Sequence, residues 1–459
     1  MAKQERKVTK KVVVDALEQI NRNAAGIDIG AEEVYVAVPP DRDEESVQTF
    51  PTYTADLHRL ADWLKACRIE TVAMESTGVY WIPVYDILEE RGFQVCLVNA
   101  RHLRNVSGRK TDVLDCQWIQ QLHTYGLLSA SFRPPEQIVA IRSLVRHREM
   151  LVQYRAAHIQ HMQKALTVMN VRLTNVLSDI SGVTGLKIIR AIVAGERNPR
   201  KLAQFRDERC AKSEEEIAKS LTGHYKPEQV FVLKQAVELY DFYDEQLENC
   251  DRELEKLYQQ FETPKDPGTP PPAPRTTKRR KNQAHFDLAP ALYRMTGVDL
   301  TQIDGVDELT IQKVLSETGI DMSKWPTVKH FTSWLHLCPN NKITGGKIKQ
   351  SGVQPSQNRA SAALRVAAAS LSHSDSALGA YYRRMRARQG APAAITSTAH
   401  KLARIIYTML KNRKPYHDLG VNYYEQQYRS RVLRNLGRQA ARLGFRLEPA
   451  ALKLSSDVS

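Results

Sequence analysis

Residues 24–38 read AAGIDIGAEEVYVAV, a run of β-branched and small residues interrupted by a turn that contains glycine. The pattern predicts two short strands. Beyond them, helical patterns at 56–67 and 83–91 alternate with short strand patterns at 71–75 and 94–98. Strands that alternate with helices of about ten residues predict an α/β sheet, and functional groups are expected at the ends of its strands.

Two later segments carry seven-residue repeats of apolar residues. The repeated positions are Ile138, Val145, Val152, Ile159, Leu166 and Leu173 in the first and Leu233, Tyr240, Leu247, Leu254 and Phe261 in the second. Such repeats predict two long helices with a coiled-coil seam. The seam joins either two helices of one chain or two protomers, and the sequence leaves both arrangements open.

A proline-rich, basic segment follows the second repeat. Residues 263–281 hold six prolines within eleven residues and end on Lys278, Arg279, Arg280 and Lys281. Because prolines cannot continue a helix, the segment is predicted to be an extended, semi-rigid linker that divides the protein. Its basic run is either a solvated charge block or a contact for phosphates.

The C-terminal half is predicted to be mostly helical. Residues 301–319 carry a glycine turn between two short helical segments, a pattern that fits a helix-hairpin-helix or a plain helical hairpin. Helical patterns follow at 358–371, 377–388 and 396–411. One basic stripe at helical spacing comes last, formed by Arg431, Arg434, Arg438 and Arg442.

The composition indicates the kind of partner. The chain has 66 Lys and Arg against 51 Asp and Glu, a net charge of +15, which favours a polyanion and most commonly nucleic acid. No window approaches the roughly 18 consecutive apolar residues of a membrane span, and the N-terminus lacks the pattern of a signal peptide. The six cysteines form no C-x-x-C pair, so neither a zinc cage nor a disulfide framework is indicated. We expect a soluble, cytoplasmic protein without membrane contact.

Four acidic residues stand out by their positions. Asp28 lies inside the first strand and Glu75 at the end of another, while Asp112 and Asp115 begin a helix. A charge inside a strand is costly unless it is paired or binds a metal. Strand ends bring the first two acids to one edge, and the other two, three residues apart, share a helix face. Oxygen ligands alone suit Mg²⁺ or Mn²⁺, and two such ions can hold the attacking and leaving oxygens of a phosphodiester.

Each of these acids also has a structural explanation. Asp112 fits the cap of a helix whose macrodipole favours acid in its first turn, and Glu75 fits a surface strand end. The ordered combination in a basic protein is what favours a nuclease-type site. Arg109 and Lys110, next to the helix acids, are then expected to meet phosphate.

The stretches around these residues resemble a known family. AGIDIG contains Asp28, MESTGVYWIP contains Glu75, and GRKTDVLD contains Asp112 and Asp115, while LCPNNKITGGK and NRASAALR lie downstream. In this order, from about residue 24 to 411, the motifs resemble those of the DEDD transposases of the IS-one-ten and IS-eleven-eleven insertion sequences, which are bridge-RNA-guided recombinases.

The resemblance implies an N-terminal RuvC-like domain of RNase H fold, a coiled-coil region that mediates oligomerisation, and a C-terminal transposase domain with a nucleophilic serine. It also implies dimers and tetramers around a structured noncoding guide RNA, whose loops pair with donor and target DNA. In such assemblies the acids of one protomer and the serine of another form a composite site. Attack by the serine leaves a DNA end covalently attached to the protein.

This chain departs from the family where the serine stands. Five residues after Pro339 it has Thr344, which offers the same hydroxyl but adds a methyl group that crowds an in-line attack. Gly345 and Gly346 behind it let a backbone approach a phosphate closely. Ser351 is the nearest rival nucleophile, and the offset of Thr344 from the flanking motifs is the better fit. A threonine that only turns a loop is the structural alternative.

Basic residues around this hydroxyl are predicted to contact phosphates: Lys347, Arg359, Arg365, Arg383 and Arg384. The predicted domains are a RuvC-like DEDD domain at 1–130, coiled-coil helices at 131–262, the linker at 263–285, the transposase domain at 286–415 and a basic tail at 416–459.

The first functional hypothesis is an RNA-guided DNA recombinase that moves an insertion sequence. A structure-selective endonuclease that resolves Holliday junctions would use only the four acids. A noncatalytic RNA- or DNA-binding scaffold would use neither the acids nor the hydroxyl.

Overall fold

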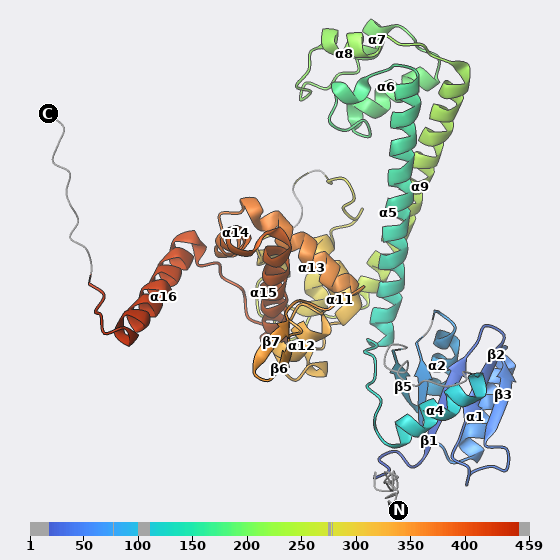
Figure 1. Cartoon of the computed structure of the whole chain (residues 1–459). Coiled ribbons are helices and arrows are strands. Elements are labelled where there is room, and N and C mark those ends of the chain that lie inside the picture. Colours follow the sequence, from blue (N-terminus) through green and yellow to red (C-terminus); the bar gives the residue numbers. More distant parts are fainter. Residues whose placement is uncertain (1–17, 77, 100–110, 274–276, 278, 449–459) are drawn as a thin grey trace, which may run out of the picture. The chain divides into compact units, whose positions relative to one another are not determined.

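The computed structural model describes residues 18–76, 78–99, 111–273, 277 and 279–448. The chain divides into two compact units, Met1–Arg133 and Pro134–Ser459, which we describe separately. The first unit contains a mixed α/β sheet and the second is mostly helical, as the sequence predicts (Figure 1).

The first unit is built on five strands in the order β3-β2-β1-β4-β5. β1, β2 and β3 are antiparallel neighbours, whereas β1, β4 and β5 run parallel. The strands are β1 (Ala24–Ile29), β2 (Glu33–Ala37), β3 (Val47–Pro51), β4 (Thr71–Glu75) and β5 (Gln94–Val98), and the described helices are α1 (Thr54–Ala66), α2 (Trp81–Glu90) and α4 (Asp112–Thr124). All of these except β3 were predicted.

Helices cover both faces of this sheet. On one face, Ile27 of β1 and Met74 of β4 pack in a core with residues of α1 and α2, among them Leu60 and Leu88. On the other face α4 lies directly on β1. A Cβ atom at Gly26 would come within 2.2 Å of the backbone nitrogen of Gln120, so only glycine permits this approach.

The second unit begins with two long helices, α5 (Glu136–Val168) and α9 (Pro227–Gln259), which lie side by side (Figure 1). The predicted seam residues Ile138 and Val145 on α5 and Leu247 on α9 are buried. The seam is therefore formed within one chain. The first helix ends sooner than its repeat predicts, because Asn170 has a left-handed φ of 54°.

Buried charges interrupt this seam. Arg148 is buried on α5 and donates to Asp251 on α9, with 3.1 Å between Nη2 and Oδ2. One heptad further along α5, Arg155 pairs with Asp244. Burying a charge is tolerated only when it is paired and hydrogen-bonded, which both arginines are.

A small helical head joins the two long helices. It contains η2 (Leu173–Asn175), α6 (Val183–Val193), α7 (Pro199–Ala203) and α8 (Glu214–Ser220). Its core includes Ile188, Ile189 and Ile192 of α6, packed with the adjoining ends of α5 and α9. Ser213 caps α8 in a capping box with Glu216.

The described part of the proline-rich segment has no helix or strand, as its prolines predict, but it is docked inside the second unit. Thr269 is buried, and its carbonyl oxygen accepts a 2.6 Å hydrogen bond from the hydroxyl of Tyr293. At the other end, the carbonyl of Asn282 accepts from Arg148 at 3.1 Å. The segment therefore does not divide the chain; the division falls after Arg133.

The remaining helices form the C-terminal body of the second unit. They are α10 (Leu288–Thr296), α11 (Glu308–Thr318), α12 (Val328–Trp334), α13 (Arg359–Ser370), α14 (Ala377–Gln389), α15 (Ala391–Asn412) and α16 (Gly420–Arg442), with η3 (Leu300–Gln302), η4 (Met322–Lys324) and η5 (Leu371–His373) between them. The predicted turn at 301–319 is present, with Gly305 at φ 76° packed close to Leu371.

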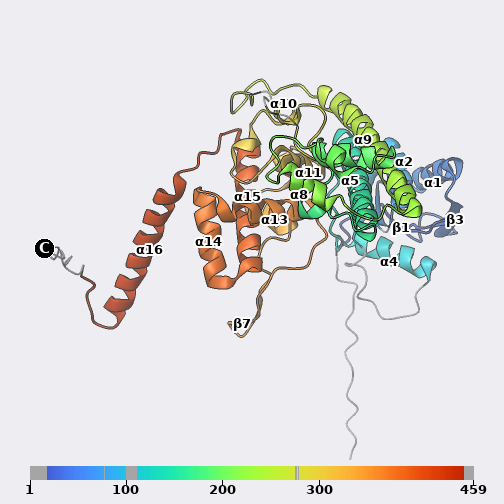
Figure 2. The same cartoon turned by 90° about the horizontal axis from the view of Figure 1, so that it is seen from above.

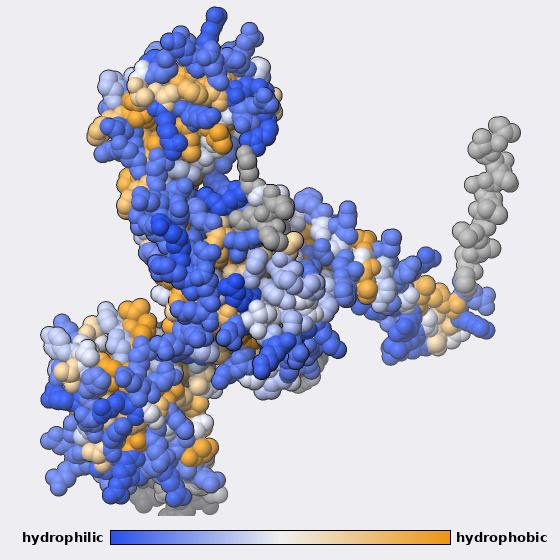
Figure 3. Space-filling model, turned by 180° about the vertical axis from the view of Figure 1, so that it is seen from behind, coloured by the Kyte–Doolittle hydropathy of each residue, from blue (hydrophilic) through white to orange (hydrophobic). Residues whose placement is uncertain are grey.

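Helix α16 differs from the others because none of its residues is buried. It carries the predicted arginine stripe and also exposes Leu433 and Leu436, so apolar and hydrophilic residues alternate on its surface (Figure 3). Along the described part of the chain, no helix is both long enough and apolar enough to cross a membrane.

Candidate active-site residues

Two of the predicted acids lie near the carboxyl ends of neighbouring strands, β1 and β4, of the first unit's sheet. In the parallel register Ile27 is the partner of Met74, so Asp28 and Glu75 follow at adjacent positions. Ile27 and Met74 belong to the core under α1 and α2. Because side chains alternate along a strand, Asp28 and Glu75 are on the opposite face, which α4 covers. Both are half-buried.

The other two acids are in the first turn of α4. Thr111 caps this helix, since its hydroxyl oxygen accepts a hydrogen bond from the backbone nitrogen of Leu114 at 3.3 Å. Asp112 is therefore not the cap. Asp112 is exposed and Asp115 is half-buried. The helix dipole favours negative charge at both positions.

The side chains of Cys116 and Tyr35 each lie near Asp28 and near one of the acids of α4. Burial raises the pKa of the Cys116 thiol to about 12, and the charges of Asp28 and Asp115 add to the shift. The pKa of Tyr35 is raised by its hydrogen bond to Glu33, with a smaller contribution from Asp112 and Asp28. Asp28 therefore shares its surroundings with both acids of α4.

The donor set suits a hard divalent cation, because it consists of carboxylate oxygens. The acids do not form a coordination shell as they stand. Within the residues that the structure describes, no three His, Cys, Asp or Glu side chains are close enough to hold one metal ion. Asp28 and Glu75 lie on the face of the sheet that α4 covers, and Asp112 and Asp115 are in the first turn of that helix. Arg109 and Lys110 lie outside the described residues.

The predicted nucleophile lies on a hairpin of the second unit. Thr344 is the last residue of β6 (Lys342–Thr344) and pairs with Lys347, the first residue of β7 (Lys347–Gln350). Gly345 and Gly346 form the turn with φ values of 58° and 74°, a conformation that glycine adopts at no steric cost. Figure 2 shows the hairpin extending away from the neighbouring helices.

Both candidate hydroxyls are accessible. Thr344 is exposed at the end of the hairpin, and Ser351 is exposed directly after β7. Pairing of Pro339 with Val353 closes the base of the hairpin. The sequence analysis predicted no helix or strand in this region and weighed a loop threonine only as the structural alternative. Two glycines between residues of β-strand type were the signal for a hairpin.

Most of the basic residues that were predicted to contact phosphates around Thr344 have partners within the chain. Arg359 donates to Glu149 at 2.7 Å and Arg365 to the carbonyl of His336 at 3.4 Å. Arg383 donates to the carbonyl of Ser374 at 2.7 Å. These arginines contribute to the packing of the body, and only their remaining N–H groups are available to a ligand.

The last predicted arginine of this group ties two helices together. Arg384 of α14 pairs with Glu425 of α16 and lies 3.3 Å from the ring centroid of Tyr428. In contrast, Lys347 is exposed on the hairpin opposite Thr344.

The basic run of the proline-rich segment is partly engaged as well. Lys281 donates to Asp179 at 2.9 Å, and Arg279 donates to the carbonyl of Gln283 at 3.1 Å. The backbone nitrogen of Arg280 donates to the side chain of Gln283. Arg280 itself is exposed. Lys278 lies outside the described residues.

The sequence analysis missed two residues that shape the acid edge, by which we mean the end of the sheet that carries Asp28 and Glu75 together with the start of α4. Gly26 allows α4 to approach β1, and its only signal was a glycine within a strand pattern, which indicates a close approach of another backbone. Tyr35 is the cross-strand partner of Asp28, a relation that depends on the register of β1 and β2.

Comparison with known families identifies two matching stretches. Residues 25–171 match a family model for DEDD transposases of the IS110 type, and residues 299–383 match a model described as the transposase IS116/IS110/IS902 family. The first stretch contains all four acids and the second contains Thr344. Together the two stretches cover about half of the chain. No curated protein matches it.

Proposed function

Because the chain belongs to the IS110 family of transposases, we propose that it is an RNA-guided recombinase that cleaves and exchanges the DNA strands of an insertion sequence. The observation that carries this proposal is that Asp28 lies beside Glu75 in the register of β1 and β4 and shares its surroundings with Asp112 and Asp115 of α4. The net charge of +15 supports a nucleic-acid partner.

We propose that the first unit is a RuvC-like domain of RNase H fold. Support comes from its strand order, with three antiparallel strands followed by two parallel ones, and from helices on both faces. In this fold the acids belong at the end of the central strand β1 and of its parallel neighbour β4, where Asp28 and Glu75 occur.

The four acids would hold Mg²⁺ or Mn²⁺. When bound, such ions stabilise the charge that develops on the attacking and leaving oxygens of a phosphodiester. Asp28 and Glu75 directly follow Ile27 and Met74, two fully buried residues of the sheet. Asp112 and Asp115 instead belong to the first turn of α4.

The hydroxyl of Thr344 is the proposed nucleophile. Its Oγ1 forms a bond to phosphorus, the bond from phosphorus to a deoxyribose oxygen breaks, and the proton of the threonine passes to the solvent or to a base at the site. The exchange of one phosphoester for another conserves the bond energy, so the covalent protein–DNA intermediate can be resolved by a second DNA end. Exposure of Thr344 on a hairpin supports this role.

We further propose that the protein acts as a dimer or tetramer on a structured guide RNA that pairs with donor and target DNA. The acids of one protomer and the threonine of another would complete the site. Base identity is then read by RNA pairing, and the protein grips the shape and the phosphates of the nucleic acid. Sequencing of RNA that co-purifies with the protein tests this part: a single structured species is expected.

Two substitutions test the reaction. Asp28→Asn removes a metal ligand without changing size, and we expect strand cleavage to fall about a thousand-fold. Thr344→Ala removes the hydroxyl, and we expect loss of the covalent protein–DNA adduct on denaturing gels. Ser351→Ala is the matched control and should recombine normally.

The same assay separates the alternatives. If Thr344→Ala still cleaves while Asp28→Asn does not, the protein is a hydrolytic endonuclease. If both variants behave like the unmodified protein, neither residue is catalytic and the proposed reaction is wrong. If Ser351→Ala alone loses the adduct, the nucleophile is Ser351.

A further inference from the structure

A cavity of about 450 Å³ lies in the second unit between α14, α15 and α16. This volume is typical of small-ligand pockets. Three cations and three tyrosines line it, namely Lys401, Arg404, Lys414, Tyr381, Tyr416 and Tyr424. All except Tyr381 lie beyond the stretch that matches the transposase family, and the reaction proposed above uses none of them.

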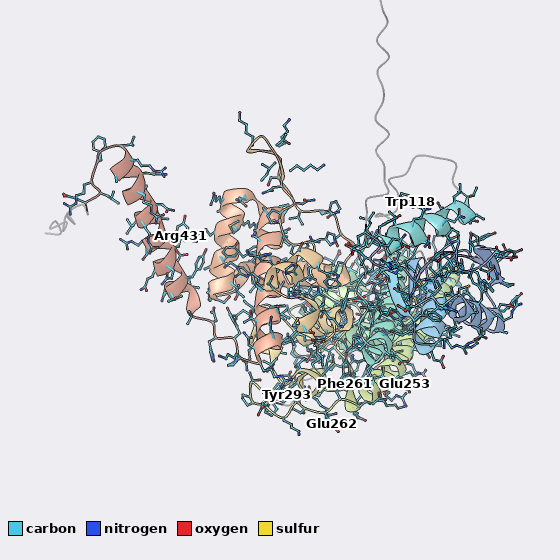
Figure 4. All side chains as sticks on the ribbon, turned by 90° about the horizontal axis from the view of Figure 1, so that it is seen from below. Trp118, Glu253, Phe261, Glu262, Tyr293 and Arg431 are labelled. Carbon is cyan, nitrogen blue, oxygen red and sulfur yellow. The ribbon has the colours of Figure 1, made fainter. Side chains whose placement is uncertain are left out.

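One side of the cavity concentrates positive charge. Burial lowers the pKa of the Lys401 ammonium, and the nearby charges of Arg404 and Arg431 lower it further. Arg431 belongs to α16 (Figure 4), and its charge acts on Lys401. Within the described residues, no carboxylate forms an ion pair with Lys401 or Arg404. Lys401 is half-buried beside the exposed Arg404 and Arg431. Cations that repel one another are stabilised by an anion, and phosphate is the anion that suits a basic nucleic-acid-binding protein.

Aromatic rings adjoin these cations. The rings of Tyr381 and Tyr424 meet edge to face with 6.3 Å between their centroids. The Nζ of Lys401 lies 4.3 Å from the ring centroid of Tyr381. Cations beside aromatic faces are the combination with which proteins hold single-stranded nucleic acids, because the cations contact the backbone while the rings stack on bases.

The rim of the cavity at Tyr416 is acidic. The hydroxyl of Tyr416 donates to Asp418 at 3.4 Å. Burial raises the pKa of Tyr416, and the charges of Asp418 and Asp304 raise it further. A phosphate is disfavoured at this rim and belongs at the Lys401 side. The acidic rim instead suits the amino groups on the edge of a base.

Helix α16 forms the outer wall of the cavity. It is held to α14 by Arg384, which pairs with Glu425 and lies over the ring of Tyr428. This attachment brings Tyr424 and Arg431 to the cavity. It also explains why a helix without buried residues packs on the body through its first half.

We propose that this cavity binds an unpaired nucleotide of a nucleic-acid strand, with its phosphate at Lys401 and Arg404 and its base against Tyr381 and Tyr424. The inference rests on the proposed function for the presence of a nucleic-acid partner, and it adds where a single strand is held. A loop of a guide RNA and a displaced DNA strand both supply such a nucleotide, and the experiment separates them.

The test measures binding of fluorescently labelled 12-nucleotide RNA, single-stranded DNA and duplex DNA to the full chain. All proteins carry Asp28→Asn, so that the DNA is not processed. One variant combines Lys401→Gln with Arg404→Gln. Its matched control combines Lys219→Gln with Arg200→Gln, two exposed cations of the helical head, and therefore loses the same charge elsewhere. A second variant is Tyr424→Leu.

We expect the Lys401 and Arg404 variant to bind one of the single strands at least ten-fold more weakly than its control. Its slope of log affinity against log salt should become shallower by about 1, because contacts to phosphates are lost. Tyr424→Leu should weaken binding by about five- to 150-fold without changing that slope, since stacking involves no counterions. Loss with RNA alone assigns the cavity to the guide, and loss with DNA alone to a displaced strand.

Equal affinity of the cavity variant and its control overturns the proposal. An equal loss with duplex DNA also overturns it, because it indicates a general electrostatic surface. If the double variant melts at a lower temperature, Tyr424→Leu decides, since this half-exposed residue of α16 contributes little to the core. Strand cleavage is measured separately with chains that keep Asp28. If the cavity variants bind normally, the proposed reaction is unaffected, and if cleavage is absent, the proposed binding at the cavity is unaffected.

Discussion

The acid edge of the first unit and the hairpin of the second are built in opposite ways. Asp28 and Glu75 follow Ile27 and Met74, which are fully buried, and α4 presses on the same strand through Gly26. Thr344 instead lies on an exposed two-stranded hairpin that turns through two glycines. A hairpin of this kind contributes little stability of its own.

The difference follows from what each region has to do. Carboxylates that share an ion must keep their positions within fractions of an ångström, so they are carried by strands and a helix in close contact. A hydroxyl that must reach a phosphate on a large nucleic acid needs exposure more than rigidity. We therefore expect substitutions under the acids to lower stability strongly, and substitutions in the hairpin to lower activity much more than stability.

The largest effect is expected at Gly26. In Gly26→Ala the new Cβ would lie 2.2 Å from the backbone nitrogen of Gln120 and 2.3 Å from the carbonyl oxygen of Cys116, so α4 must move away from β1. We expect a loss of about 3 kcal/mol in the free energy of unfolding of the first unit, measured with urea, and the loss of strand cleavage.

Gly437→Ala is the control for this experiment. Gly437 lies within α16 and a Cβ there meets nothing within 4 Å, so alanine should stabilise the helix by up to about 1 kcal/mol. Equal stability of Gly26→Ala and the unmodified chain would show that α4 does not rest on β1.

A smaller effect on stability is expected in the hairpin. Replacing Gly345 and Gly346 together by alanine puts two Cβ atoms into left-handed backbone, at a cost of about 1–2 kcal/mol for each residue. Because the hairpin is exposed, it opens locally, and the melting temperature of the second unit should change by less than about 2 °C. Formation of the covalent adduct should nevertheless fall at least ten-fold. A large drop in melting temperature with full activity would contradict the comparison.

An effect of about 1 kcal/mol is expected from pH in the first unit. His123, in the last turn of α4, is buried and lies 2.8 Å from the hydroxyl of Thr71 on β4. Burial lowers the pKa of its imidazole. The unfolded chain therefore binds a proton more readily than the folded one, so the stabilisation is present above about pH 6.5 and is lost as the pH falls below it.

His123→Gln measures this contribution. Its free energy of unfolding should decrease less between pH 7 and pH 5 than that of the unmodified chain, by about 1 kcal/mol. His58, a partly exposed histidine of α1 in the same unit, provides the control His58→Gln, which should keep the pH dependence that arises from His123. An identical pH dependence of the His123 variant and the unmodified chain would mean that the imidazole does not fasten α4 to the sheet.

The sequence predicted those parts of the fold whose signals are local. Alternating and heptad patterns identified all strands of the first unit except β3, and both long helices. β3 was missed because Phe50 is its only buried residue, so it lacks the alternation of a half-buried strand. The heptad continues to Leu173, but the left-handed backbone at Asn170 ends α5 first.

The candidate site was predictable to a smaller extent. Strand ends suggested that Asp28 and Glu75 are neighbours, and the register of β1 and β4 confirms that they are. What the sequence could not reveal are partners that only the fold brings together. Arg359 was predicted to meet phosphate, yet Glu149 lies 210 residues away in the chain and 2.7 Å away in space. The pairing of Arg148 with Asp251 inside an apolar repeat is of the same kind.

The smallest effect is expected for Thr344→Ser, and it sharpens the comparison most directly. Serine keeps the hydroxyl and removes the methyl group that crowds an in-line attack, so covalent adduct should form a few-fold faster, which corresponds to about 1 kcal/mol in the activation free energy. Because the side chain is exposed, the melting temperature should stay unchanged. Thr49→Ser on β3 is a control that should alter neither. A slower reaction of Thr344→Ser would mean that the methyl group positions the hydroxyl, and that the hairpin is a more ordered part of the site than its exposure indicates.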